Sequence, residues 1–584
     1  MITPAQTCGA AWSSRSVTWV DVIRERAQHN PERVLYTFLV DGESRECRLT
    51  CQETEQHARA IAAHLLRHAA PGDRALLLYP PGLEYITALL GCFCAGVVAV
   101  PTWPPHRARL ELTLPRLRSI VADVQPRVVL TTLAGLGIAE AVGRYAEELG
   151  SLRWLATDDL DVDLADEWHD PGVSAHSIAL VQYTSGSTAT PKGVALSHRN
   201  LLHNSGILHQ TLGHSRETVG VVWLPPYHDM GLIGGILQPL YVGFPVVLMS
   251  PLHFLQRPLR WLTAVSRHRG TTSGGPNFAY DLCVRRTTAA QRTAVDLRSW
   301  DVAVVAAEPI NHVTLERFAA AFATCGFRPA TFRPSYGLAE ATLMVTSRVG
   351  SRTLPSSRTG RDEAPDGCPR GLVSCGEPRP GQRLLIVSPE SGVPCPPGET
   401  GEIWVAGPSV ARGYWNRPAE TVATFGARLA TTGDGPFLRT GDLGFLHDGE
   451  LFVNGRLKDL IIIRGRNHHP EDIEWTVAHS HPSMRAGAGA AFSVVTEGEE
   501  QLVVVHELDR HDRHPDVDPI VDTIRSAVIE RHDVWIASIL LVRAGALPRT
   551  ASGKIRRFAC REAYLDGTLS GHRSDLQAPA PDRV

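Results

Sequence analysis

The chain has 584 residues, of which 43 % are hydrophobic and 20 % are charged, so it is long enough for more than one domain, and this composition excludes a disordered or fibrous protein. Its 58 basic and 61 acidic residues give a net charge of −3, which excludes a global attraction to nucleic acid or to an anionic membrane. The 11 cysteines lack the paired spacing of a metal site or a disulfide framework, which favours a reducing, cytoplasmic location.

The first 330 residues alternate helical periods with short apolar runs. The apolar positions from Ala58 to Leu65 follow the spacing of one helix face, and a turn at 71–73 then leads into a strand at 75–79. The apolar run at 86–100 is too short to span a membrane, and no signal peptide is visible. Further buried strands are predicted at 128–130, 178–181, 219–224, 246–249 and 302–305. This alternation is typical of parallel sheets covered by helices.

The sequence pattern changes twice towards the C-terminus. From about residue 380, short strands and Gly/Pro turns predict a smaller β-rich subdomain. After NGRLKD at 454–459 an α+β pattern follows, with strands in LIIIRGR, QLVVVHE and SILLV and a helix that begins near Pro470. We therefore predict an N-terminal α/β domain over 1–457, a C-terminal α+β domain over 458–566 and a disordered tail over 567–584.

Lysine is almost absent from the chain. Of the 58 basic residues only three are lysines, Lys192, Lys458 and Lys554. This bias is typical of G+C-rich coding, under which a lysine that is free to become arginine is expected to have been replaced. A compact ammonium on a flexible stem can follow a phosphate oxygen where a planar guanidinium cannot. Because all three lie in glycine-bearing motifs, we predict functional roles for them rather than chance retention at the surface.

A loop rich in glycine and hydroxyl groups follows the strand that ends at Tyr183. In TSGSTATPKGV, residues 184–194, the glycines let the backbone approach a phosphate, and hydroxyls and amides can donate to its oxygens. The Pro-Lys-Gly at 191–193 replaces the ending of a Walker A loop, which excludes that motif. We predict a phosphate-binding loop, although TSGS taken alone is better explained as a polar surface turn.

Five motifs together resemble the acyl-adenylate-forming enzymes in order and spacing. They are the loop at 184–194, SYGLAEATL at 335–343, RTGDLG at 439–444, GRLKD at 455–459 and PRTASGKIRR at 548–557. The resemblance covers essentially the whole chain. It implies an α/β fold with a large N-terminal domain of parallel-type sheets covered by helices, a β-rich subdomain, and a small mobile α+β C-terminal domain that rotates about a hinge at Lys458.

Within this superfamily the chain is most similar to the fatty acyl-AMP ligases. The discriminating segments are VAVPTWPPHR at 98–107, LPPYHDMGLIGGILQPL at 224–240, SGGPNFAYDLCVRR at 273–286 and RGRNHHPEDIE at 464–474. The resemblance implies that a medium- or long-chain fatty acid reacts with ATP, in the presence of Mg²⁺, to give acyl-AMP and pyrophosphate. The acyl group would then pass to the phosphopantetheine thiol of a separate acyl carrier protein.

The resemblance also implies roles for single residues. Lys554 would be the catalytic residue, because its charge would bridge the attacking carboxylate and the α-phosphate. Glu340 and Thr188 would lie on the Mg²⁺ side, since hard oxygen donors suit a hard cation. The fatty acid would contact His228, Asp229, Met230, Gly231 and Gly275. The nucleotide would contact Thr184, Ser185, Gly186, Ser187, Thr188, Lys192, Glu308, Pro309, Ser335, Tyr336, Gly337, Asp442 and Arg456.

Three of these assignments have simpler alternatives. Tyr336 would stack on adenine, yet an aromatic residue at this place also fits an ordinary core. Asp442 would hold the ribose hydroxyls with Arg456, yet aspartate is also common in turns. His228 and Asp229 fit a pair that caps a helix as well as they fit a substrate gate.

Three features depart from the family pattern. Ala306 replaces the glycine that usually begins the adenine-pocket motif, and His469 stands where tyrosine is common. Residues 348–370 correspond to an insertion that opposes the use of coenzyme A, but here the stretch is polar, with few apolar anchors. An acyl-CoA ligase and a stand-alone adenylation enzyme for an amino or aryl acid therefore remain alternatives. A nucleotide-binding protein without catalysis is disfavoured by the retained Lys554.

Overall fold

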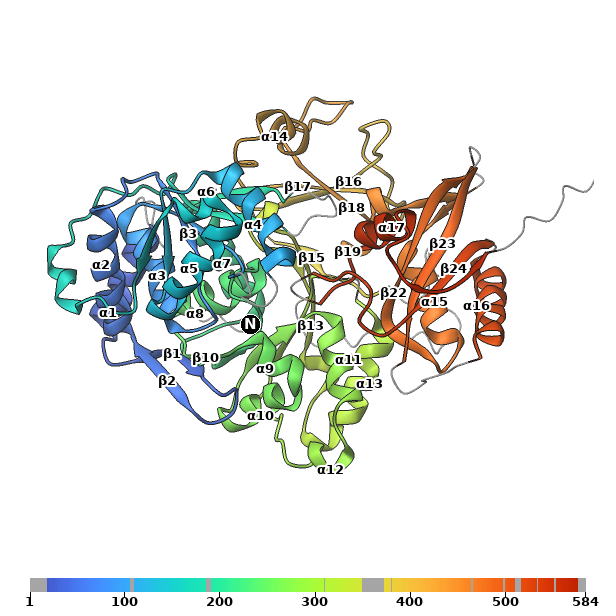
Figure 1. Ribbon diagram of the computed structural model, residues 1–584, viewed down its shortest axis with the longest axis horizontal. Helices are drawn as coiled ribbons and strands as arrows, with labels where there is room; N and C mark the ends of the chain where they lie inside the picture. The colour runs from blue at the N-terminus through green and yellow to red at the C-terminus, as the bar shows by residue number, and fades with distance from the viewer. Residues whose placement is uncertain are drawn as a thin grey trace, which may run out of the picture.

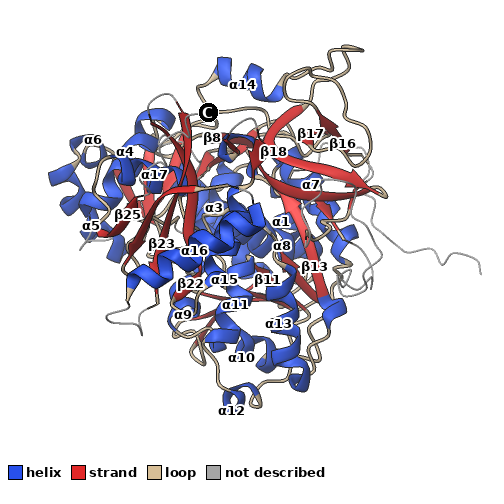
Figure 2. Cartoon of the chain, turned by 90° about the vertical axis from the view of Figure 1, so that its right-hand side faces the viewer, coloured by secondary structure: helices blue, strands red, loops and turns tan. Residues whose placement is uncertain are grey.

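The computed structural model of the chain describes residues 18–104, 110–184, 191–308, 310–348, 372–379, 381–463, 466–496, 499–509, 516–532, 534–550 and 553–575. Two large mixed sheets with their helices form the N-terminal part, and a separate four-stranded sheet with three helices lies at the opposite end of the molecule (Figures 1 and 2). A third, antiparallel sheet stands between them along the chain. The α/β fold class predicted from the sequence is therefore confirmed.

The first large sheet has six strands in the order β6-β5-β3-β4-β7-β8. Its strands are β3 (Arg74–Leu77), β4 (Val98–Pro101), β5 (Val128–Thr131), β6 (Arg153–Ala156), β7 (Ile178–Tyr183) and β8 (Gly193–Ser197). All pairs are parallel except β7 with β8. Its helices are α2 (Cys51–Leu66), α3 (Leu83–Ala95), α4 (Leu110–Val124), α5 (Leu133–Tyr145) and α6 (Glu147–Gly150).

The apolar run at 86–100 folds as most of α3 followed by β4. Cys92 and Cys94 are buried within α3, as small hydrophobic residues of the core. Among the described residues, none of the helices combines the length and the hydropathy that a membrane crossing requires.

The second large sheet has nine strands in the order β15-β14-β13-β12-β11-β9-β10-β1-β2. The parallel strands are β1 (Val34–Leu39), β9 (Gly220–Val222), β10 (Val246–Met249), β11 (Thr272–Gly275), β12 (Val302–Val305) and β13 (Phe332–Gly337). Antiparallel strands β2 (Glu46–Thr50), β14 (Met344–Ser347) and β15 (Glu377–Pro378) flank them.

Different helices cover the two faces of this sheet. Because successive side chains of a strand point to opposite faces, Val221 and Trp223 pack with one cluster, whereas Val222 packs with the other. The first cluster includes α9 (Pro251–Gln256), α10 (Leu259–Arg267), α11 (Asn277–Arg285) and α13 (His312–Phe322), with α12 (Ala289–Arg292) nearby in the chain. The second includes α1 (Trp19–His29), α7 (His198–Leu212), α8 (Gln238–Val242) and the π-helix η3 (Met230–Leu237).

The β-rich segment expected from about residue 380 is an antiparallel sheet. It consists of β16 (Arg383–Val387), β17 (Gly401–Ala406), β18 (Leu438–His447) and β19 (Glu450–Arg456), and α14 (Pro418–Phe425) contacts β18. A short hairpin of β20 (Ile461–Ile463) and β21 (Arg466–His468) follows after Lys458.

The C-terminal sheet has the order β22-β23-β24-β25. Its strands are β22 (Met484–Thr496), β23 (Glu499–Leu508), β24 (Ile536–Val542) and β25 (Gly571–Asp575), and its helices are α15 (Pro470–Ser480), α16 (Val517–His532) and α17 (Arg557–Leu565). The predicted strands in QLVVVHE and SILLV and the helix that begins at Pro470 are confirmed.

The expected disordered tail at 567–584 is wrong for its first part. Residues 571–575 form β25, which pairs with β24 from Val542 opposite Gly571 to Ser538 opposite Asp575. The segment is polar and mostly exposed, so it carries no apolar alternation. Its backbone groups nevertheless satisfy the open edge of β24, and this needs no particular side chains. Residues 576–584 lie outside the described residues.

A buried histidine joins three helices of the N-terminal part. His198 is the first residue of α7, and its Nδ1 accepts a hydrogen bond of 3.2 Å from the backbone N–H of Trp19 in α1. Its ring also packs against the edge of Phe93 in α3, with 5.4 Å between the ring centroids. Burial lowers the pKa of His198 from 6.5 to about 4, so the folded protein holds this imidazole neutral.

This burial predicts a loss of stability in acid. The unfolded chain binds a proton at His198 near pH 6.5, whereas the folded chain binds it only near pH 4, so stability falls as the pH drops through this window. We expect the unfolding temperature of the His198→Gln variant to fall less steeply from pH 6.5 to 4.5 than that of the wild type. Differential scanning calorimetry at fixed ionic strength measures both profiles, and parallel profiles would contradict the assignment.

Candidate active site

One cavity of about 360 Å³ gathers residues from most of the chain. Its lining includes Ala306 and Ala307, which directly follow β12, and residues 335–340, which run from the end of β13. It also includes the end of β7 at Thr184 and the loop before α17 at Lys554. The carboxyl ends of parallel strands are the usual ligand-binding edge of such sheets. All three lysines of the chain line this single cavity.

Lys554 enters the cavity from the C-terminal part. Its Nζ donates a hydrogen bond to the backbone carbonyl of Ala307. Burial lowers the pKa of Lys554 below its ordinary value, but the carboxylates of Glu308 and Asp229 oppose this effect and favour the ammonium. The cation is therefore held at the junction of the two parts of the molecule, with acidic groups on the N-terminal side.

The loop that carries Lys554 is fixed by a buried carboxylate of β23. The Glu507 side chain is fully buried and accepts hydrogen bonds from the Leu547 backbone N–H at 3.2 Å and from Arg549 at 3.2 Å. Arg549 in turn donates to the carbonyl of Gly553 at 3.1 Å. The loop is closed by Thr550, whose N–H donates to the carbonyl of Lys554 at 2.7 Å. Glu507 is thus a positioning residue for the lysine.

An arginine that follows Lys554 ties the same loop to the predicted hinge. Arg557, near the start of α17, donates to Asp459 at 2.6 Å, and Asp459 is the neighbour of Lys458. The same guanidinium binds Glu474 at 2.8 Å and Glu471 at 3.0 Å on α15. Burial of an arginine requires such partners, and three carboxylates supply them here. The position of Lys554 is therefore coupled to the backbone at residue 459.

A buried aspartate organises the opposite wall of the cavity. Asp442 lies on β18 directly across from Arg456 on β19. Its carboxylate accepts a hydrogen bond of 2.8 Å from the Tyr336 hydroxyl and one of 2.9 Å from Arg456 Nε. A carboxylate offers about four lone-pair positions, so Asp442 retains capacity to accept further donors. Tyr336 and Arg456 line the cavity on either side of it.

A second carboxylate, Glu340, lines the cavity next to the glycine-rich loop. Glu340 accepts a hydrogen bond of 2.9 Å from the hydroxyl of Tyr414. Burial raises the pKa of Glu340 despite this hydrogen bond, so a cation nearby would favour its ionised form. Lys192 lies over the ring of Tyr414, 4.9 Å from its centroid, and forms an ion pair with Glu420.

His228 and Asp229 lie at the start of the π-helix η3 and both line the cavity. Asp229 caps the helix, because its Oδ1 accepts the N–H of Met230 at 2.6 Å, and the same oxygen lies 2.6 Å from His228 Nδ1. Burial would raise the pKa of Asp229, but His228, the Met230 N–H and Lys554 lower it overall. Asp229 therefore caps the helix, as one of the two alternatives expects, and because both residues also line the cavity their contact with a substrate stays a prediction.

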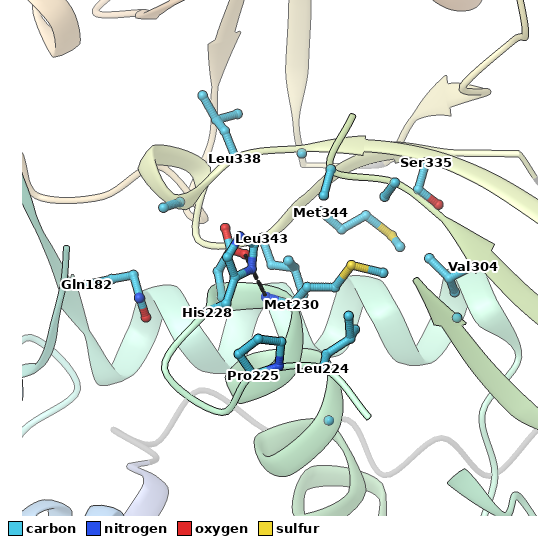
Figure 3. Close-up of a pocket in the computed structure, with 18 of the residues that line it drawn as sticks. Gln182, Leu224, Pro225, His228, Met230, Val304, Ser335, Leu338, Leu343 and Met344 are labelled. Atoms are coloured by element: carbon cyan, nitrogen blue, oxygen red, sulfur yellow. Dashed lines mark hydrogen bonds and ion pairs between the residues drawn. The ribbon is translucent and has the colours of Figure 1, made fainter. Parts of the chain in front are cut away.

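Beyond this polar mouth the cavity continues as an apolar arm. Figure 3 shows Leu224, Met230, Val304, Leu343 and Met344 around this part of the cavity. The apolar side chains of the arm are Leu208, Leu212, Val222, Leu224, Met230, Phe244, Val246, Val304, Leu343 and Met344. The cavity thus joins a charged mouth to a hydrocarbon-like arm, and it fits a ligand with one anionic end and one apolar end.

The structure brings most of the predicted site residues together. The cavity lining contains Thr184, Lys192, His228, Asp229, Met230, Ser335, Tyr336, Gly337, Glu340, Arg456, Lys458 and Lys554. Asp442 and Glu308 stand directly behind it, the first bound to Tyr336 and the second holding the Phe278 N–H at 2.6 Å. The remaining nucleotide and Mg²⁺ residues, Ser185, Gly186, Ser187, Thr188 and Pro309, lie outside the described residues, as does most of the 348–370 stretch.

Two glycines predicted to contact substrate, Gly231 and Gly275, are absent from the cavity lining and pack tightly against neighbouring segments. A Cβ atom on Gly231 would lie 2.1 Å from the carbonyl oxygen of Pro225, and one on Gly275 would lie 2.7 Å from the indole of Trp223. Both positions lie behind the lining, where space for a side chain is missing. The two glycines therefore allow close approach of neighbouring segments, and their contact with a substrate stays a prediction.

Several lining residues were not found from the sequence. Tyr414, Gln182 and His214 line the cavity but belong to none of the recognised motifs. No sequence motif marked the apolar arm, because the residues that line it come from separate strands and helices. The Gly-Gly pair at 234–235 in an otherwise apolar helix was the one visible irregularity.

Comparison with known proteins identifies clear relatives. The chain matches the AMP-binding enzyme family over residues 23–415 and the AMP domain of Disco-interacting protein 2-like proteins over 458–574. It is 46 % identical over 566 residues to the medium-chain-fatty-acid–[acyl-carrier-protein] ligase JamA of Moorena producens, which covers 94 % of this chain and 96 % of that protein. It is 37 % identical to the long-chain-fatty-acid–AMP ligase FadD26 of Mycobacterium marinum, with 93 % and 96 % covered.

A solved structure shows the same likeness in three dimensions. The fatty acyl-adenylate ligase from Legionella pneumophila, determined in complex with acyl adenylate and pyrophosphate, is 40 % identical to this chain. The TM-score is 0.71, and the match covers 96 % of this chain and 98 % of the other.

Proposed function

The chain belongs to the AMP-binding enzyme family, and on that premise we propose that it is a fatty acyl-AMP ligase that loads a carrier protein. It activates a medium- or long-chain fatty acid with ATP, releases pyrophosphate, and transfers the acyl group to the phosphopantetheine thiol of a separate acyl carrier protein. The observation that carries this proposal is the single cavity that joins the mouth around Lys554 to an apolar arm.

In the first step the fatty acid carboxylate attacks the α-phosphorus of ATP. The new P–O bond forms in line with the bond to the leaving pyrophosphate, and negative charge spreads over the phosphoryl oxygens. The Lys554 ammonium lies where the arm meets the mouth, so it stabilises this charge and orients the carboxylate. Glu308 and Asp229 keep Lys554 charged in the meantime.

The nucleotide is bound by the groups around Asp442. Tyr336 offers its ring to the adenine, and Asp442 accepts the ribose hydroxyls while Arg456 fixes the carboxylate. Thr184 and Lys192 hold the phosphates at the end of β7. A carboxylate such as that of Asp442 suits a ribose, since the two ribose hydroxyls can both donate hydrogen bonds to one carboxylate.

The carboxylate of Glu340 suits a divalent cation. It is buried, its pKa is raised, and it offers hard oxygen donors at the edge of the cavity. We propose that Glu340, together with Thr188, holds Mg²⁺. When bound, the ion supplies neutralisation of the phosphate charge. Tyr414 orients Glu340 through its hydroxyl.

In the second step the carrier thiol attacks the acyl carbonyl, and AMP leaves. Lys554 occupies the junction between the two parts of the molecule, so the loop has to withdraw before a phosphopantetheine arm reaches the adenylate. We propose that the C-terminal part, residues 458–566, rotates about Lys458 for this purpose. The Arg557–Asp459 ion pair lies beside that hinge and moves with it.

The acceptor is tested by product analysis. We expect the purified enzyme to form acyl-AMP from ATP and a series of fatty acids. When a phosphopantetheinylated carrier protein is added, we expect the acyl group to be transferred to the carrier. When CoA is offered in place of the carrier, we expect little acyl-CoA. Mass spectrometry identifies each product. Efficient acyl-CoA formation would favour the CoA ligase, and activity confined to amino or aryl acids would favour the other adenylating class.

The role of Lys554 is tested by two substitutions. Lys554→Ala and Lys554→Arg should each lower acid-dependent pyrophosphate release by at least about 10²-fold, which is typical for loss of one preorganised contact to a transition state. Arginine keeps the charge, but its planar fork does not fit the place of a compact ammonium. Near-normal pyrophosphate release by a folded Lys554→Arg protein would contradict the catalytic role proposed for Lys554.

The proposed hinge is tested by separating the two steps. Lys458→Pro restricts the backbone dihedral angles that a rotation has to change. We expect this variant to form acyl-AMP but to lose transfer to the carrier, whereas Lys458→Ala, which leaves the backbone free, should lose much less of the transfer. Single-turnover assays of each step make the comparison. Equal loss of both steps in a folded Lys458→Pro protein would argue against a hinge.

A further inference from the structure

The apolar arm runs along one face of the nine-stranded sheet, from the carboxyl ends of its strands to their amino ends. At the carboxyl side it begins near Ala306, which follows β12. At the amino side the strand residues of its lining end at Gly220, Val246 and Thr272, the first residues of β9, β10 and β11, and Phe244, just before β10, also lines the cavity there. These three residues lie side by side in register, so they form one row across the sheet.

The register of the strands gives the length of the arm. Thr272 pairs with Val302 on β12, and Ala306 lies four residues further along the chain. At about 3.3 Å per residue the two levels are about 13 Å apart. One bond of an extended hydrocarbon chain advances about 1.2 Å, which is one third of the reach of a residue, so the arm accommodates up to about 11 carbons beyond the carboxyl carbon.

His214 closes the arm at its far end. It follows α7 directly after Gly213, whose positive φ of 64° turns the chain back towards the sheet. His214 Nε2 lies 3.1 Å from the hydroxyl of Thr272, which places the ring at the level of the last row. Its Nδ1 lies 3.3 Å from the side-chain amide of Gln238, and its ring packs on Phe244 at 5.1 Å between centroids.

Both ring nitrogens of His214 are therefore engaged, and the ring is neutral. Burial lowers the pKa of His214 to about 3, so it carries no charge at physiological pH. The side chain faces the arm as a flat, rigid wall that is held from three sides. It has no spare nitrogen to offer a polar group at the end of a substrate, so the terminus of the bound chain has to be apolar.

The roof of the arm is built from the π-helix η3. Gly235 packs tightly on β9, because a Cβ there would lie 2.8 Å from Val222. Gly234 is different: a Cβ there would meet nothing nearer than Leu343 Cδ2 at 3.7 Å, and Leu343 also lines the arm. A side chain at position 234 would therefore project into the arm and shorten it.

We propose that His214 is the residue that sets the length of the acyl chain, and that the enzyme selects saturated or otherwise apolar-ended acids of up to about 12 carbons. This proposal rests on the fatty acid function proposed above. The length limit comes from the place of the imidazole at the last row of the sheet, and Gly234 keeps the path to it open.

The test compares adenylation of decanoic and tetradecanoic acid by pyrophosphate release. Removal of the imidazole in His214→Ala opens the far end of the arm. The ratio of kcat/KM for tetradecanoic over decanoic acid should therefore rise at least about tenfold. This factor is the lower limit for discrimination of a single methylene group in an apolar pocket. Gly234→Leu should act in the opposite direction. In this variant the ratio of kcat/KM for hexanoic over decanoic acid should be at least about tenfold higher than in the wild type.

His198→Ala is the matched control. Like His214, His198 is a buried, neutral histidine whose ring packs against a phenylalanine. It is the first residue of α7, and it does not line the cavity. Its substitution should destabilise the protein and leave the length ratios unchanged.

Unchanged ratios in His214→Ala and Gly234→Leu, or a wild-type kcat/KM that keeps rising through octadecanoic acid, would overturn the proposal. If the wild-type enzyme forms no adenylate with any fatty acid, this result would contradict the proposed function itself. If His214→Ala does not fold, Gly234→Leu, which leaves the floor intact, still decides whether this arm holds the chain.

Discussion

The contact between Lys554 and the backbone at Ala307 is the interaction on which the rest of the site depends. A cation inside a protein needs compensating partners, and here they come from both halves of the molecule. Glu308 and Asp229 face the ammonium from the N-terminal side, while Glu507 fixes the loop from the C-terminal side. The lysine is thus in place only when the C-terminal sheet is docked on the cavity, so the chemistry is tied to the arrangement of the two parts.

Ionic contacts also connect the lysine loop to the proposed hinge. Arg557 joins α17 to Asp459 and to α15, so the proposed rotation at residue 458 would displace Lys554 at the same time. An enzyme with two successive steps needs a device that removes the first catalytic group before the second reactant arrives. The ion pairs of Arg557 with Asp459, Glu471 and Glu474 connect the lysine loop to the proposed hinge for such a motion.

The acyl arm depends on a different constraint, the alternation of side chains along parallel strands. One face of β9, β11 and β12 packs on α10, α11 and α13, and the other face carries small residues such as Gly220 and Gly274. The π-helix η3 closes over this face, packed closely at Gly235 and open at Gly234. The space between sheet and helix is therefore a structural consequence of missing side chains, and it ends where a side chain, His214, returns to fill it.

The sequence by itself determined the α/β class, the main strands and helices, and the charged mouth of the site, because these depend on local periodicity and on short motifs. The scarcity of lysine was especially informative, since Lys192, Lys458 and Lys554 are far apart in the chain yet line one cavity. Only the tertiary structure decided the apolar arm, the place of His214 beside Thr272, the tight packing at Gly231 and Gly275, and the pairing of β25. The physical reason is that each of these depends on strand register, on the direction of a Cβ atom or on backbone hydrogen bonds, none of which leaves a pattern in the order of side chains.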